Sequence, residues 1–174
     1  MDEFQDEYSA ALEGDVHELK GALLGDTINT LGPLEPICIP PSISVREAAT
    51  RMTAAHLAAV LIVDADRRLV GIFTERDVLA RVVAQGLDVD RTPVGQVMTP
   101  SPEALSTSDR VCYAVNRMSV AGYRTIPLVD SAGRPIGIVT VTHFIKWLAD
   151  LFPEAILNLR PGDALKRPSE VDAG

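Results

Sequence analysis

The sequence has few of the features that mark secreted and membrane-spanning proteins. Its 174 residues include two cysteines, Cys38 and Cys112, too few for a disulfide framework and without the Cys-x-x-Cys spacing of redox and zinc motifs. No apolar run approaches the roughly 18 residues that a membrane-spanning helix needs. The acidic start, MDEFQDEYSA, is unlike a secretory signal. We therefore expect a cytoplasmic protein that does not enter a membrane.

Positive charge is scarce where a nucleic-acid-binding surface would need it. The formal net charge is −8, and the first 26 residues hold eight acidic residues against one basic residue, Lys20. The rest of the chain, with 16 acidic and 15 basic residues, is nearly neutral. Because binding to a phosphate backbone depends on clustered Lys and Arg side chains, nucleic acid is not expected as a partner.

Residue combinations that would indicate catalysis are missing as well. The three histidines, His17, His56 and His143, fall in different predicted elements, and no His-x-x-x-His, His-Glu-x-x-His or Gly-x-Ser-x-Gly motif occurs. Neither cysteine has an evident base beside it. We predict that the chain is not an enzyme and that it requires no metal or cofactor.

What the sequence does contain is an internal repeat. A shift of 66 residues aligns positions 36–79 with 102–145 without a gap, and 13 of these 44 pairs are identical. The pairs include turn and strand positions, such as Asp64 with Asp130 and Gly71 with Gly137. Self-similarity of this kind indicates two copies of one structural unit.

Both copies have the same order of predicted elements. A short extended segment leads into an amphipathic helix, which in the first copy begins at the capping box formed by Ser44 and Glu47. Two apolar runs separated by a polar turn then predict a β-hairpin. A second helix follows, over 75–85 in the first copy and 141–151 in the second. Thr92-Pro93 predicts a further helix start before the second copy.

The predicted fold class is α/β (α+β). A β-α-β-β-α unit of about 50 residues cannot cover both faces of its sheet alone, so two copies should pack sheet to sheet, with pseudo-twofold symmetry. We divide the chain into an acidic N-terminal helical extension (1–25), a first repeat (26–86), a linker with a second repeat (87–153) and a C-terminal tail (154–174). In the extension, apolar residues spaced among acidic ones predict an amphipathic helix over 3–24, bent near Gly14, which would pack on the fold or dock a partner. The tail after Pro161 is predicted to be disordered.

These features resemble the CBS pair, or Bateman module, named after cystathionine β-synthase. The resemblance covers about residues 26–152 and is carried by the two copies, by VGQVMTP, by the P-L-V-D and G-x-P-x-G-I-V-T patterns and by GIFTERD at 71–77. Similar modules bind AMP, ADP, ATP or S-adenosyl groups in two clefts between the copies and regulate an associated protein. The resemblance therefore implies an adenine-nucleotide sensor that forms a homodimer and signals to a separate, unknown effector protein.

The GIFTERD segment has a physical rationale of its own. A strand that runs into a helix N-terminus presents free N–H groups to an anion, and Asp77, three residues after Thr74, offers two acceptor oxygens to a ribose diol. The same two residues also match a Thr-x-x-Asp capping box, which occurs at ordinary helix starts. Ligand binding and helix capping therefore both remain open for this pair.

By position, the resemblance assigns residues to two clefts. The first would use Gly71, Ile72, Thr74 and Asp77, with Ala58 at the phosphate position and Pro102, Glu103 and Ala104 alongside the base. The second would use Gly137, Ile138, Thr140 and His143, with Arg124 at the phosphate position and Pro36, Ile37 and Cys38 alongside. The first cleft then has the ribose acid but no cation, and the second has a cation but a histidine in place of the acid. We expect a nucleoside-rich ligand in the first cleft, and a phosphate-rich one, bound more weakly or not at all, in the second.

Two of these residues have alternative roles. Arg124 would either pair with phosphate or simply face solvent, and His143 would either make a pH-dependent contact with ribose or serve its own helix start. An alternative also exists for the whole chain, namely a dimeric interaction scaffold with empty clefts. Its contact surface would be the acidic extension or the region of Trp147, which with Phe144 is expected in the core or in a dimer interface.

Overall fold

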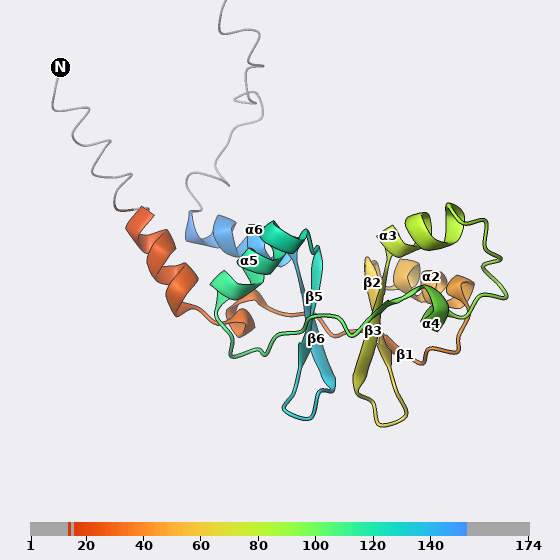
Figure 1. Cartoon of the computed structure of the whole chain (residues 1–174). Helices are drawn as coiled ribbons and strands as arrows, with labels where there is room; N and C mark the ends of the chain where they lie inside the picture. Colours follow the sequence, from red (N-terminus) through yellow and green to blue (C-terminus); the bar gives the residue numbers. More distant parts are fainter. Residues whose placement is uncertain (1–13, 15, 153–174) are drawn as a thin grey trace, which may run out of the picture.

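The computed structural model describes residues 14 and 16–152, in which two similar halves lie side by side with their hairpins at the centre (Figure 1). The first copy comprises β1 (Cys38–Ile39), α2 (Val45–Ala54), β2 (Ala59–Val63), β3 (Leu69–Thr74), α3 (Glu75–Asp77) and η2 (Val78–Val83). The second comprises α5 (Val111–Ala121), β5 (Thr125–Val129), β6 (Pro135–Thr140) and α6 (Val141–Leu151). Short lead-in elements precede each copy, namely η1 (Ile28–Leu31) before the first, and α4 (Val94–Val97) and β4 (Thr99–Pro100) before the second.

The two hairpins have the same register. Leu61 lies opposite Ile72 in the first, and Pro127 lies opposite Ile138 in the second, which are equivalent positions under the shift of 66 residues. β1 pairs in parallel with β2, whereas in the second copy this pairing is reduced to a single bridge between Leu105 and Leu128. The predicted order of elements is thus confirmed in both copies.

The copies pack through their sheets, as the fold class predicted. Ile138 of the second copy is buried in one cluster with Ala59, Leu61 and Ile72 of the first copy. At the tip of the second hairpin, the Gly133 carbonyl accepts a hydrogen bond of 2.9 Å from the amide of Leu69. Each copy also has a core of its own between its sheet and its helices.

The lead-in elements are exchanged between the copies. Ile28 and Leu31 of η1, which precede the first copy, are buried in the core of the second. Val94 and Val97 of α4, which precede the second copy, are buried in the core of the first. The sequence predicted the helix start at Thr92-Pro93 before α4. It did not indicate this crossing, because Ile and Val side chains carry no information about which core they fill.

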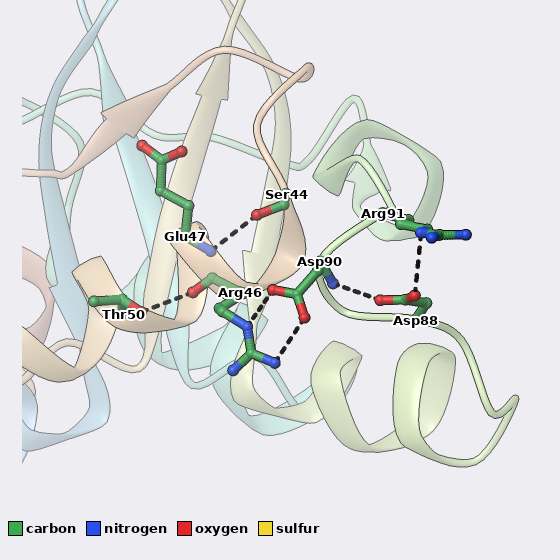
Figure 2. A network of polar contacts seen from close by, with 7 residues as sticks. All are labelled: Ser44, Arg46, Glu47, Thr50, Asp88, Asp90 and Arg91. Carbon is green, nitrogen blue, oxygen red and sulfur yellow. Dashed lines mark hydrogen bonds and ion pairs between the residues drawn. The ribbon is translucent and has the colours of Figure 1, made fainter.

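The linker before α4 is held against α2 (Figure 2). The Arg46 guanidinium pairs with Asp90 and holds the pKa of that carboxyl below its usual range, although both side chains are exposed. The Ser44 hydroxyl accepts the Glu47 amide at 3.2 Å, so this half of the predicted capping box is present. The Glu47 side chain instead pairs with Arg51 one turn further along, so the reciprocal half is not formed.

The second helix of the first copy differs from the prediction in its type. After the three residues of α3, the segment Val78–Val83 is a π-helix, in which the Ala84 amide bonds to the Leu79 carbonyl. The equivalent α6 is an α-helix throughout. Short π segments are rare and frequently lie at functional sites.

A helix over 16–25 covers part of the predicted N-terminal helix and packs Leu19, Ala22 and Leu23 on the core of the second copy. The stretch of that prediction before Gly14 and the tail after Pro161 lie outside the described residues. No helix within 14 and 16–152 is long and apolar enough to cross a membrane.

Candidate functional site

A cavity of about 290 Å³ lies between the two copies and includes much of the predicted first cleft. The first copy contributes Ala58, Ile72, Thr74 and Asp77. The segment that enters the second copy contributes Thr99, Pro102 and Glu103, and the second copy contributes Arg124, Thr125 and Pro127. The site is therefore built from both repeats, and neither repeat encloses it alone.

Asp77 is the buried acid of this cavity, with 7% of its surface exposed. Its Oδ2 accepts hydrogen bonds from the Thr74 amide, at 2.9 Å, and from the Thr74 hydroxyl, at 2.7 Å. The Asp77 amide completes the reciprocal capping box by donating to Thr74 Oγ1 at 3.3 Å. Of the two roles considered for Thr74 and Asp77, ligand binding and helix capping, the capping role is thus present. It leaves the second carboxylate oxygen, Oδ1, without a bond to Thr74.

Arg81 takes up that second oxygen, with its Nε 3.3 Å from Asp77 Oδ1. Its Nη1 also donates to the carbonyl oxygens of Val97, at 3.1 Å, and Met98, at 2.6 Å, at the end of α4. Arg81 lines the cavity, as do Arg76 and Tyr123. Sequence reasoning missed all three, although the spacing of four residues between Asp77 and Arg81 is a recognisable ion-pair signal on a helix.

Arg124 lies elsewhere than we expected, because it lines the cavity around Asp77, whereas the sequence placed it in the second cleft. The reason is that the strand starts of both copies meet at this cavity. The Ala58 carbonyl accepts the amide of Glu75, and the Arg124 carbonyl accepts the amide of Val141, each at 3.1 Å. The expectation that the first cleft has no cation is therefore wrong.

Glu103 is the second acid of the cavity that has an intrachain partner. Its carboxylate pairs with Arg117 of α5 at 3.0 Å. Ala104, its predicted neighbour along the base, is not among the residues that line the cavity.

Two cations of the cavity have side chains that are unpaired in the part of the chain that the structure describes. While Arg81 is paired to Asp77, the side chains of Arg76 and Arg124 make no hydrogen bond or ion pair within residues 14 and 16–152. These two guanidinium groups are available to an anion.

Gly71 packs closely against the Met98 side chain. A Cβ at this position would lie 2.2 Å from the Met98 sulfur, far inside van der Waals contact. A Cβ at the equivalent Gly137 would lie 3.3 Å or more from the nearest atoms of Leu128, Pro33 and Leu34. Leu34 also exchanges two backbone hydrogen bonds with Ile138, so the lead-in of the first copy runs along the second hairpin.

The predicted second-cleft residues Thr140 and His143 form a capping box of their own. His143 Nδ1 accepts the Thr140 amide at 2.9 Å, which requires that this nitrogen carries no proton. Burial, with a smaller contribution from the charge of Lys146, lowers the pKa of His143. His143 is 8% exposed. Its bond to the Thr140 amide shows that the alternative role considered for it, at its own helix start, is present in the structure.

Pro36, Ile37 and Cys38 lie along the first hairpin, where the Ile37 carbonyl accepts the Leu61 amide at 2.8 Å. The half-buried Cys38 packs on the cluster between the two sheets. Burial raises the pKa of its thiol, an effect that Arg67 opposes and Glu35 reinforces. None of these three residues lines the cavity around Asp77.

The fold is similar to those of solved CBS domain proteins. The CBS domain protein PAE2072 from Pyrobaculum aerophilum, complexed with AMP, has a TM-score of 0.65, 25% identity, and coverage of 74% of this chain and 99% of that one. The CBS domain pair of protein MJ0100, in complex with 5′-methylthioadenosine and S-adenosyl-L-methionine, has a TM-score of 0.64, 26% identity, and coverage of 71% and 99%. Both of these similar pairs hold an adenosyl compound.

Curated relatives are mostly much longer proteins. The Meiotically up-regulated gene 70 protein of Schizosaccharomyces pombe is 37% identical over 109 residues, which are 63% of this chain and 15% of that protein. The CBS domain-containing protein CBSCBSPB5 of Arabidopsis thaliana is 29% identical over 148 residues, which are 84% of this chain and 26% of that protein. The chain thus spans less than a third of the length of these two relatives.

A family model described as the CBS domain matches residues 32–84 and again 94–150. The two matches correspond to the two copies that the internal repeat predicted, and together they make up more than half of the 174 residues. The chain therefore belongs to the CBS domain family and is a tandem pair of CBS repeats.

Proposed function

We propose that this chain is a regulatory module that binds an adenosyl ligand, such as AMP, ADP, ATP or an S-adenosyl compound, in the cavity between its repeats. Binding would be reported to a separate effector protein. In this proposal Asp77 receives the ribose hydroxyls, the segment at Pro102 and Glu103 lies along the base, and Arg124 meets the phosphate. The module itself performs no chemistry.

The observation that carries the proposal is the composition of the cavity. It brings a buried carboxylate, Asp77, together with two guanidinium groups without intrachain partners, Arg76 and Arg124, and with apolar wall at Ile72 and Pro127. A nucleotide has the matching parts, since its diol donates hydrogen bonds, its phosphate is anionic and its flat base has apolar faces. The volume, about 290 Å³, is at the small end for ligand pockets.

The second cleft remains a proposal of weaker binding. His143 replaces the acid there, and its Nδ1 is already occupied by the Thr140 amide. Arg124, the cation that the second cleft was expected to use, lines the cavity around Asp77. We therefore propose one principal ligand per chain, in the first cleft. There Arg124 adds the phosphate contact that the sequence had assigned to the second cleft.

Thermal unfolding tests the proposal. Wild type should be heated alone and with AMP, ADP, ATP, S-adenosylmethionine or GTP, since a ligand at 100 times its dissociation constant stabilises by about 2.7 kcal/mol. We expect a higher Tm with at least one adenosyl compound and no change with GTP. The matched variant is Asp77→Asn, which keeps an acceptor for the Thr74 amide but loses the charge, and which should lose the shift. No shift with any compound at millimolar concentration would reject the proposal.

A homodimeric scaffold with empty clefts is the second candidate, and one observation favours it. Both helices of the second copy carry exposed apolar side chains, since Tyr113 and Val120 of α5 and Ile145 of α6 are 56%, 76% and 58% exposed. Of their equivalents in the first copy, Glu47 on α2 is paired with Arg51, whereas Leu79 on η2 is itself 66% exposed. Sedimentation of wild type and of Val120→Glu would test it, because a dimer formed through this face should dissociate in the variant while ligand binding is unchanged.

A further inference from the structure

We infer that Arg81 competes with the ligand for Asp77, and that this competition transmits occupancy of the first cleft to helix α4. The inference rests on the proposed function, because it requires a ligand ribose at Asp77. It adds a residue that controls the affinity of the site and a route by which binding reaches the segment between the repeats.

The two oxygens of Asp77 are used differently. Oδ2 is committed to Thr74 through two hydrogen bonds within the helix start. Oδ1 is held by the Arg81 guanidinium, at 3.3 Å, which is a longer contact. Arg81 is 44% exposed at its side chain, so its ion pair is partly screened by water and weak. A ribose hydroxyl donating to Asp77 would therefore take Oδ1 and displace Arg81 more readily than it would break the capping box.

The other end of Arg81 lies on the connection between the repeats. Its Nη1 donates to the carbonyl oxygens of Val97 and Met98, which end α4. Those carbonyls would otherwise lack a partner within a helix of four residues. A few residues later the same segment lines the cavity at Thr99, Pro102 and Glu103. Arg81 thus contacts the proposed ribose site and the C-terminal end of α4 at the same time.

Displacement of Arg81 from Asp77 has a consequence at α4. The Asp77 carboxylate fixes the guanidinium in the orientation in which it also reaches the two carbonyls. Once a ribose hydroxyl takes Asp77 Oδ1, the carboxylate no longer holds the guanidinium in that orientation. The end of α4 then loses its cap, and its backbone opens more often.

The second copy has no such arrangement. The position equivalent to Arg81 is Trp147, whose indole N–H donates to Asp26 Oδ2 at 2.9 Å. Trp147 therefore also holds the lead-in of the opposite copy, but through a neutral, buried group. No hydrogen bond joins it to His143 within 14 and 16–152. The coupling is accordingly a property of the first cleft alone.

The competition is tested by the affinity of the Arg81→Met variant. The ligand is the adenosyl compound that gives wild type the largest increase in Tm. Methionine keeps the apolar stem but makes no ion pair, so we expect tighter binding by roughly two- to fivefold, the range that a partly exposed ion pair allows. Arg91→Met is the control, because Arg91 lies in the linker, is 89% exposed and pairs weakly with Asp88. Its affinity should equal that of wild type.

Hydrogen exchange at the Met98 amide, which bonds to the Val94 carbonyl at 2.9 Å, tests the transmission. In wild type the ligand should speed exchange there, whereas in Arg81→Met exchange should already be fast and should not respond. Two results would overturn this inference and leave the proposed function standing. One is that wild type binds the ligand and Arg81→Met binds it with equal or lower affinity. The other is that the ligand slows exchange at the Met98 amide of wild type. Absence of binding in both proteins would instead reject the proposed function itself.

Discussion

Asp77 and His143 occupy equivalent positions in the two repeats and cap equivalent helices, yet they differ in what else they can do. The carboxylate of Asp77 has an oxygen that Thr74 does not use. The imidazole of His143 has committed its unprotonated nitrogen to the Thr140 amide. At this one position the first repeat thus has a carboxylate oxygen outside the capping box, whereas the acceptor nitrogen in the second is used by it.

The capping bond of His143 predicts a pH dependence of stability. A proton on Nδ1 would turn the acceptor of the Thr140 amide into a donor, and burial together with Lys146 lowers the pKa of the folded-state imidazole. The contribution of His143 is complete above the unfolded-state pKa of about 6.5. It is lost as the pH falls below that value toward the folded-state pKa, because only the unfolded chain binds the proton readily.

Urea unfolding at pH 7.5 and 5.5 measures this effect. Wild type should lose more free energy of unfolding between these two values than His143→Asn, whose amide oxygen can accept the Thr140 amide without titrating. His17 and His56 are present in both proteins and cancel in the comparison. Equal losses in the two proteins would show that His143 does not titrate as its hydrogen bond requires.

At the scale of elements, the exchanged lead-ins decide how the repeats depend on each other. η1 begins the first copy in sequence but fills the core of the second, and α4 does the reverse. Ile28 of η1 is fully buried there, and its amide bonds to the Asp109 carbonyl at 2.8 Å. Each copy therefore completes the other.

Ile28→Ala tests the exchange. Removal of a fully buried isoleucine side chain leaves a cavity, so we expect a loss of about 2–4 kcal/mol in the free energy of unfolding. Leu34→Ala is the control in the same lead-in segment, because Leu34 is 46% exposed and should cost less than about 1 kcal/mol. Similar small losses in both variants, measured by urea unfolding, would mean that η1 is not part of the second core.

The elements most readily predicted from the sequence were those with repeated local signals. The apolar runs of both hairpins, the Ser44 helix start and the α6 boundaries followed from periodicity and from agreement between the two copies. The π-helix at Val78–Val83 did not, because its residues are ordinary for an α-helix. Arg124 lines the cavity around Asp77, although its sequence equivalence to Ala58 had assigned it to the second cleft, because the residues before β2 and β5 both reach this cavity.

At the scale of the whole molecule, the exchanged elements and the shared cluster around Leu61, Ile72 and Ile138 predict that the two repeats unfold together. The single tryptophan, Trp147, is 6% exposed in the second core and gives a fluorescence signal for that repeat alone. Far-UV circular dichroism reports on both repeats. We expect coincident urea transitions from the two probes. A fluorescence transition that clearly precedes or follows the dichroism would show that the repeats are independent.

Cooperative unfolding also bears on signalling. A module whose repeats complete each other can transmit a change at their shared cavity through the segments that cross between them. The α4 end, which contacts Arg81, is one such segment, and the Asp26 region, which contacts Trp147, is the other. An effector protein that contacts the α4 end would be placed to sense the cavity, because that end alone shares Arg81 with it.

Isothermal titration calorimetry with the adenosyl compound that stabilises the protein most is the most direct test of the central claim. We predict one principal ligand per chain, binding that is lost in Asp77→Asn and weakened in Arg124→Gln, and binding that is unchanged in His143→Asn. Binding by Asp77→Asn equal to that of wild type, or no binding by wild type at millimolar ligand, would contradict a ligand site between the repeats at Asp77.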